Sequence, residues 1–224
     1  MEARPSIAVL TFPGSNDDRD AAWALGSLGA EPVLVWHGDG ELPDVQAVVL
    51  PGGFSYGDYL RCGAIARFAP ATAAVKRFAD EGGLVLGICN GFQILCEAGL
   101  LPGVLRPNRS LQFVCRDVPL AVERNDVPFT ARCEQGQRLT IPVKCGEGAW
   151  YGELPDEQVV LRYAGENPTG ALDGVAGVCN EAGNVMGLMP HPEHAVDPLL
   201  GSGDGALVLA SLIDAARERL AVPH

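Results

Sequence analysis

Residues 84–95 read LVLGICNGFQIL, and this stretch decides the fold. Leu84–Ile88 is apolar apart from one glycine, which is typical of a parallel strand covered on both faces. A helix over Asn90–Ala98 is expected to follow after a single residue, Cys89. Glycines two positions before and after Cys89 allow this tight turn, because a side chain at either place would clash. The stretch therefore predicts a nucleophile elbow, a strained turn that exposes a reactive side chain.

The helix that follows the elbow is expected to make the Cys89 thiol reactive. The amino terminus of a helix carries partial positive charge, so we expect the pKa of this thiol to lie below its ordinary value. The backbone N–H of Asn90 is expected to point at an oxyanion formed on an attacked carbonyl. Gln93 lies one turn along the same helix face, where its amide can contact a polar substrate. The plainer explanation is a buried thiol that fits a tight turn.

A second motif, His191-Pro192-Glu193, offers a base for that thiol. Pro192 favours an extended backbone at His191, and in extended chain side chains two residues apart point the same way. Glu193 can then accept the ring N–H of His191 and orient the imidazole. Taken alone, the motif is more typical of a polar turn facing solvent. An elbow thiol and an oriented histidine together predict a triad of Cys89, His191 and Glu193.

Gly52 and Gly53 form a third motif, directly after an expected strand over Ala47–Leu50. Ligands of open parallel sheets bind at the carboxyl ends of the strands. Two glycines there let the backbone approach a substrate closely and supply a second oxyanion donor. The alternative is an ordinary glycine-rich turn.

The first half of the chain alternates strands and helices. Further strands are expected at Ser6–Thr11 and Pro32–Trp36, and helices at Asp17–Leu28 and Ala71–Asp80. Asn16 or Asp17 is a suitable N-cap for the first helix. Such alternation builds a parallel sheet with helices on both faces.

The second half predicts short strands joined by turns, and then a helix. The strands are Ser110–Glu123, Gln137–Val143, Val159–Tyr163, Val175–Cys179 and Val185–Met189, with a hairpin connection at Glu181–Asn184. The helix, Gly203–Leu220, is expected to be capped by Asp204 and to pack Leu207, Leu209, Leu212 and Ile213 inward. The fold class is therefore α/β. It is a three-layer sandwich with a mostly parallel central sheet and antiparallel additions, in a single domain over residues 1–224.

Composition excludes several classes of protein. The 224 residues are 47% hydrophobic and 20% charged, which excludes intrinsic disorder. No apolar run approaches the ~18–20 residues of a membrane span. The net charge of -12 disfavours binding to nucleic acid. The seven cysteines lack metal-binding spacing, so no metal site is expected, and the absence of a signal peptide predicts a cytoplasmic protein.

These motifs together resemble the class I, or triad, glutamine amidotransferases, which have a flavodoxin-like α/β fold. The family carries a GxCxGxQ elbow, here residues 87–93, and a late HPE motif, here residues 191–193. Within the family, the chain is similar to the glutaminase subunits of phosphoribosylformylglycinamidine synthase. That narrower resemblance rests on PGGFSYGDYLRCGAIA at 51–66, GEG at 146–148, NEAGNVMGLMPHPE at 180–193 and GSGDG at 201–205.

The resemblance implies a role for each motif. Cys89 would attack the side-chain amide of glutamine, His191 would act as base and acid, and Glu193 would orient it. Gly52, Gly53, Asn90 and Gln93 would bind substrate. Glutamate would be released, and ammonia would pass to a large synthase subunit that uses ATP and Mg to convert formylglycinamide ribonucleotide to the amidine. A small third subunit would assemble the complex, and this chain would hold no cofactor.

The chain has only two lysines and no phosphate-binding loop, as expected of a protein whose partner binds the ATP. Two residues depart from the family pattern. Cys145 stands before Gly146-Glu147-Gly148, where histidine is frequent, and His194 follows the HPE motif in place of arginine. We expect both to lie away from the triad, near the partner surface. The alternatives are a glutaminase subunit for another amidotransferase complex and a DJ-1/PfpI-like cysteine protein.

Overall fold

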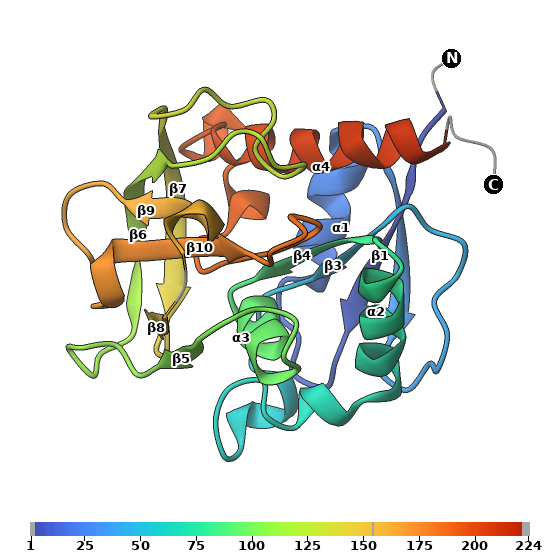
Figure 1. Ribbon diagram of the computed structural model, residues 1–224, viewed down its shortest axis with the longest axis horizontal. Helices are drawn as coiled ribbons and strands as arrows, with labels where there is room; N and C mark the ends of the chain where they lie inside the picture. Colours follow the sequence, from blue (N-terminus) through green and yellow to red (C-terminus); the bar gives the residue numbers. More distant parts are fainter. Residues whose placement is uncertain (1–2, 154, 221–224) are drawn as a thin grey trace.

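The parallel half of the central sheet is built from the apolar strands of the first hundred residues. The computed structural model describes residues 3–153 and 155–220 (Figure 1). Four strands pair in parallel with a fifth from late in the chain, in the order β2-β1-β3-β4-β11. They are β1 (Ser6–Thr11), β2 (Glu31–Trp36), β3 (Ala47–Leu50), β4 (Leu84–Ile88) and β11 (Val185–Leu188). Every residue of β3, β4 and β11 is buried, as expected for strands covered on both faces.

The antiparallel half continues the same sheet beyond β11, in the order β10-β9-β6-β7. Its strands are β6 (Val114–Val122), β7 (Arg138–Cys145), β9 (Val159–Tyr163) and β10 (Val175–Cys179). The predicted hairpin is confirmed, because β10 and β11 pair antiparallel across residues 180–184. The predicted antiparallel additions are therefore present, and the α/β fold class is confirmed.

Helices cover both faces of the sheet. They are α1 (Asp18–Ser27), α2 (Pro70–Asp80), α3 (Asn90–Glu97) and α4 (Gly205–Leu220). α1 and α4 pack against each other on one face, whereas α2 and α3 contact β4 on the other (Figure 1). Leu209, Leu212 and Ile213 of α4 are buried as predicted, and Leu207 is half-buried.

The structure differs from the sequence prediction at several edges. The strand expected from Ser110 begins only at Val114, and β7 runs on to Cys145. A separate two-stranded sheet of β5 (Val104–Arg106) and β8 (Ala149–Tyr151) was not predicted. Three-residue strands carry too little periodicity to be recognised in a sequence.

The side chains of two predicted helix N-caps make other contacts and do not cap their helices. Asp17 stands at the N-cap of α1, but its side chain makes no capping hydrogen bond. The Asp204 carboxylate accepts the backbone N–H of Thr140 in β7 at 2.7 Å. Both carboxylates are used in contacts between segments far apart in the sequence, which local patterns do not reveal.

One hydrophobic core includes residues from both halves of the chain. The single domain over residues 1–224 stays a prediction, and residues 1–2 and 221–224 lie outside the described part. Among the described residues, no helix is both long and apolar enough to cross a bilayer.

Candidate active site

Cys89 occupies a strained backbone turn between β4 and α3. Its φ is 50° and its ψ is -103°, a conformation that L-residues rarely adopt. A side chain at Gly91 would run into the carbonyl oxygen of Leu50 in β3, and one at Gly87 would run into the Gly91 backbone. The two glycines thus let the start of α3 pack directly on the sheet. The predicted elbow is present, with the thiol at the amino terminus of α3.

His191 and Glu193 reach the elbow because β11 lies beside β4. Ile88 and Leu188 are in register, and the Cys89 N–H donates to the Leu188 carbonyl at 2.8 Å. Both strands therefore end at the same edge, and the chain after β11 turns through a short 3-10 segment, Pro192–His194. His191 Nδ1 lies 2.6 Å from Glu193 Oε1, and both side chains are almost completely buried.

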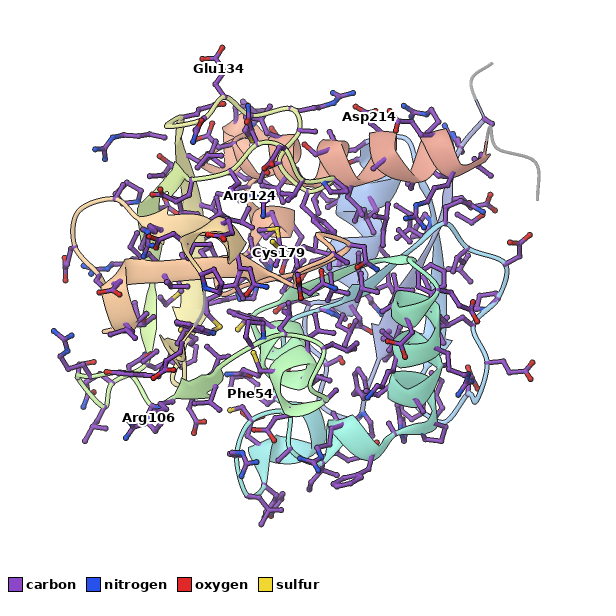
Figure 2. All side chains as sticks on the ribbon, viewed as in Figure 1. Phe54, Arg106, Arg124, Glu134, Cys179 and Asp214 are labelled. Carbon is purple, nitrogen blue, oxygen red and sulfur yellow. The ribbon has the colours of Figure 1, made fainter. Side chains whose placement is uncertain are left out.

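The unused ring nitrogen of His191 is available for proton transfer. Among the described residues, His191 Nε2 is buried and has no hydrogen-bond partner. A cavity of about 300 Å³ is lined by both Cys89 and His191. Its other walls come from the loops after β3 and β7 and from α3, and include Gly53, Phe54, Gln93, Cys145, Gly146 and Glu147. Figure 2 labels Phe54 below α3, in the loop that follows β3.

The backbone of Gly53 is oriented by a short bridge to Ser15. Phe54 N–H donates to the Gly14 carbonyl and Asn16 N–H donates to the Gly52 carbonyl, so the Gly53 N–H points away from this pair. Within residues 3–153 and 155–220, the Gly53 N–H donates to no protein acceptor. Gly53 has a φ of 149° and no space for a side chain, because Gly14 and Asn16 lie against it. Gly53 therefore lines the cavity and has a backbone N–H without a protein acceptor in the described chain.

Asn90 and Gln93 build the α3 side of the site. The Asn90 backbone N–H lies against the Cys89 sulfur. The Asn90 side chain accepts the Ser55 N–H at 3.1 Å and donates to Gln93 Oε1 at 2.9 Å. Gln93 Nε2 donates to the Glu147 carbonyl at 2.7 Å. Asn90 thus hydrogen-bonds to the loop after β3, and Gln93 hydrogen-bonds to the loop after β7.

The comparisons with known proteins agree with this geometry. The CobB/CobQ-like glutamine amidotransferase domain matches residues 4–203. A phosphoribosylformylglycinamidine synthase subunit PurQ from Rubrobacter xylanophilus is 56% identical over 218 residues, covering 94% of this chain and 99% of that protein. The PurQ of Salinibacter ruber is 52% identical, covering 96% of this chain and 97% of that protein. The chain belongs to the PurQ family of glutamine amidotransferases.

Solved structures place the fold in the same family. A chain from the structure of PurLQS from Thermotoga maritima superposes with a TM-score of 0.90 at 47% identity, covering 95% of this chain and 99% of that one. Another glutamine amidotransferase from Thermotoga maritima has a TM-score of 0.60 at 16% identity, covering 99% of this chain and 100% of that one, and shows only that the fold is shared. Membership of the glutamine amidotransferases does not support the DJ-1/PfpI-like alternative.

The thiol of this PurQ-family site is protonated at rest, contrary to the prediction from the helix terminus. Burial raises the pKa of Cys89 well above its ordinary value, and Cys145, Asp17 and Glu193 raise it further. The Asn90 N–H acts in the opposite direction and is outweighed. In a buried site, desolvation and nearby carboxylates dominate over the partial charge of one helix end. Thiolate formation therefore requires a base in the site.

Asp17, Lys144 and His194 form a polar cluster that sequence reasoning missed. Lys144 Nζ lies 2.5 Å from Asp17 Oδ1 and 3.0 Å from His194 Nε2. His194 Nε2 is 3.3 Å from Asp17 Oδ1 and 3.7 Å from Glu193 Oε1. The expectation that the two departures from the family pattern avoid the triad is wrong. His194 borders Glu193, and Cys145 lines the same cavity as Cys89.

Four side chains of this region have the spacing of a metal site. Ligand atoms of Asp17, His191, Glu193 and His194 lie within 4.8 Å of one another. The Lys144 ammonium already contacts two of these residues and supplies the positive charge that the carboxylates need. A divalent ion would be repelled by this lysine. The prediction that the site uses no metal stays a prediction.

Proposed function

We propose that this chain is the glutaminase subunit of a phosphoribosylformylglycinamidine synthase. It hydrolyses glutamine to glutamate and ammonia, and it passes the ammonia to a synthase partner. One observation carries the proposal most directly. A cysteine on a strained elbow and a buried His191–Glu193 pair border the same cavity, in a chain whose relatives named PurQ match it over nearly its full length.

The chemistry begins with proton transfer, because the Cys89 thiol is protonated at rest. His191 Nε2 takes the thiol proton while Cys89 Sγ attacks the side-chain amide carbon of glutamine. Glu193 accepts the Nδ1–H of His191 and stabilises the imidazolium that forms. The imidazolium then gives its proton to the leaving nitrogen, so that ammonia departs and a glutamyl thioester remains. Water, deprotonated by His191, cleaves the thioester and releases glutamate.

The oxyanion of each tetrahedral intermediate is held by two backbone N–H groups. The Asn90 N–H lies against the Cys89 sulfur, and Gly53, which lines the cavity, has an N–H without a protein acceptor in the described chain. Gly52 leaves room for His191, because a side chain there would meet the His191 ring. Loss of one such donor costs about 10²–10³ in rate.

Substrate contacts come from the remaining walls of the cavity. Gln93 holds the Glu147 carbonyl, and both residues line the cavity that opens beside Cys89. We assign Gln93 to the glutamyl group of the substrate, which it binds by hydrogen bonding, together with the backbone at Gly52, Gly53 and Asn90.

The acceptor chemistry belongs to partner chains. PurQ relatives are named as subunits of the synthase, and the Thermotoga maritima neighbour comes from a PurLQS structure. The large partner binds ATP and Mg and converts formylglycinamide ribonucleotide to the amidine, and a small third subunit completes the assembly. The chain itself uses no cofactor. All seven cysteines are free thiols, which fits the reducing cytoplasm as the place of the reaction.

The test is a complex reconstituted from this chain, the large synthase and the small subunit. With glutamine, ATP and formylglycinamide ribonucleotide, we expect one glutamate for each amidine formed. Cys89→Ala should abolish glutamine-dependent synthesis and retain synthesis with free ammonium, because the acceptor site lies on the partner. Normal use of glutamine by the Cys89→Ala complex would overturn the proposal, as would a wild-type complex that accepts only ammonium.

A further inference from the structure

Asp17 lies at the junction of two parts of the active site. Its side chain is 6% exposed, although it carries a charge and precedes a surface helix. Asp17 Oδ2 is 3.6 Å from His191 Nδ1, the same nitrogen that Glu193 contacts at 2.6 Å. A buried carboxylate with no capping bond to its own helix requires another explanation.

The backbone of Asp17 contacts the opposite side of the site. Its N–H and that of Asn16 both donate to the Gly52 carbonyl at 3.2 Å. The Gly52–Gly53 peptide that follows carries the N–H assigned above to the oxyanion hole. A side chain at Gly52 would collide with Asp17 Oδ2 and with the His191 ring. Because Gly52 has no side chain, Asp17 and His191 can approach each other at this point.

We propose that Asp17 is a positioning residue of the glutaminase site, which sets the orientation of His191 through its carboxylate and the position of Gly53 through its backbone. This inference rests on the proposed function. Lys144 from β7 and His194 from the HPE turn hold the carboxylate in place. The cluster thereby connects the loop before α1 to β7 and to the turn that carries His191.

The charge of Asp17 is maintained by its neighbours. Burial alone would raise the pKa of Asp17, but hydrogen bonds from His194 and Lys144 and the charge of His191 together bring it well below its usual range. The pKa of His194 is raised, chiefly by its hydrogen bond to Asp17. Asp17 is thus ionised throughout the working pH range and places a negative charge 3.6 Å from His191 Nδ1.

Other charged or titratable groups also border His191 and must be included in any account of pH dependence. They are Glu193 and His194 on its own turn, Lys144 and Cys145 on β7, Cys89 at the elbow and Asp20 of α1, which reaches His194 at 3.8 Å. Asp17 and Lys144 have opposite charges and adjoin each other, so removing either side chain leaves the other without its partner.

The experiment compares three variants in the reconstituted complex. Asp17→Asn removes the charge and keeps the size and the backbone N–H, whereas Lys144→Met removes the partner charge. Asp18→Asn is the matched control, because Asp18 is the next residue and its carboxylate contacts only the Thr11 hydroxyl, at 3.1 Å, among the described side chains. Glutamate release is measured across pH, and ammonium-dependent synthesis reports on assembly.

We expect Asp17→Asn to lower kcat for glutamine about 10–100-fold, the scale of a misplaced catalytic group, with ammonium-dependent synthesis retained. The KM for glutamine should change little, so that the loss falls on kcat, because the variant misplaces the base and not the substrate. Lys144→Met should lower kcat in the same way, because it removes one of the two contacts that hold the Asp17 carboxylate. The control should match the wild type in both measurements.

Two results would decide against the inference. An Asp17→Asn variant whose kcat matches that of the control would remove Asp17 from the positioning of His191. Loss of ammonium-dependent synthesis in parallel with glutamate release would show general damage to the complex in place of a positioning effect. A wild-type complex without glutamine use would refute the proposed function itself, which is a separate outcome.

Discussion

Cys89 and Cys145 show why neighbouring thiols in one cavity have different roles. Only Cys89 stands on the strained turn and beside the Asn90 N–H. Burial raises the pKa of Cys145 to about 12, and its sulfur lies 3.9 Å from the Asn108 side chain. The nucleophile is thus selected by backbone geometry, since both thiols border the same cavity.

Cys145→Ser should therefore keep most of the glutaminase activity. The hydroxyl can take over the contact to Asn108, and no step of the proposed mechanism uses the Cys145 sulfur. The measurement is glutamate release by the reconstituted complex, with Cys89→Ser as the matched substitution. A loss as complete as that of Cys89→Ser would show that the assignment of a single nucleophile is incomplete.

The raised pKa of Cys89 predicts slow alkylation of the free chain at neutral pH. A simple electrophile such as iodoacetamide reacts with thiolate, and burial beside Asp17 and Glu193 keeps this thiol protonated. Cys115 is exposed and serves as an internal reference. We expect Cys89 to react more slowly than Cys115 at pH 7 and to gain rate above the ordinary range of thiols. Faster labelling of Cys89 at pH 7 would instead support an activated thiolate at rest.

The individual residues also show what the sequence alone revealed about the site. Cys89, His191 and Glu193 stand in local motifs whose glycine and proline spacing is visible in one chain. Asp17 and Lys144 are 127 positions apart, and nothing in either local sequence marks their contact. Burial in the folded site raises the pKa of Cys89, and the distant Asp17 raises it further, so the predicted direction was wrong.

At the scale of elements, the elbow works because α3 packs directly on β3 and β4. Gly91 is the point of closest approach, where any side chain would meet the Leu50 carbonyl. A backbone oxygen inside the sheet has little freedom to move, so the helix itself would have to shift.

Gly91→Ala should destabilise the chain by about 1–3 kcal/mol and strongly reduce glutaminase activity, because it overpacks a rigid contact and displaces the elbow. Gly40→Ala is the matched control, since no atom lies within 4 Å of a side chain built there. Denaturant unfolding of both variants measures the difference. Equal stability of the two variants would contradict the close packing of α3 on the sheet.

Element boundaries were predictable where burial leaves a continuous apolar pattern. β1, β4, β9, β10 and the main helices agree with the sequence to within a few residues. β5 and β8 were missed, because three-residue strands have no pattern of their own, and β6 begins later than predicted. The α/β class followed from the alternation of elements, whereas the position of β11 between β4 and β10 required the structure.

At the scale of the whole molecule, one loop stands out as a candidate for control by partners. Residues 52–63 follow β3 and include Tyr56, Asp58 and Leu60, all at φ between 54° and 71°. Tyr59 and Leu60 are largely exposed, while Gly53 at the start of the loop borders the cavity. A docking partner can change the conformation of a strained, exposed loop and so move the oxyanion donor at its start.

The free chain should therefore turn over glutamine slowly, and turnover should rise strongly with the synthase, its nucleotide and the small third subunit. Movement of a single oxyanion donor accounts for about 10²–10³ in rate. Glutamate release by the purified chain and by the reconstituted complex gives the comparison. Equal turnover in both would show that the site is already complete without partners.

The central claim is that Cys89 is the nucleophile of a glutamine-hydrolysing site, and covalent labelling tests it most directly. The reconstituted complex is incubated with a glutamine analogue that carries an electrophile in place of the side-chain amide. Intact mass and peptide mapping then locate the label, and glutamate release is followed in parallel. The account predicts one label per chain, on Cys89, with loss of glutaminase activity in proportion and protection by glutamine. A label on another of the seven cysteines, or activity that survives full labelling of Cys89, would contradict it.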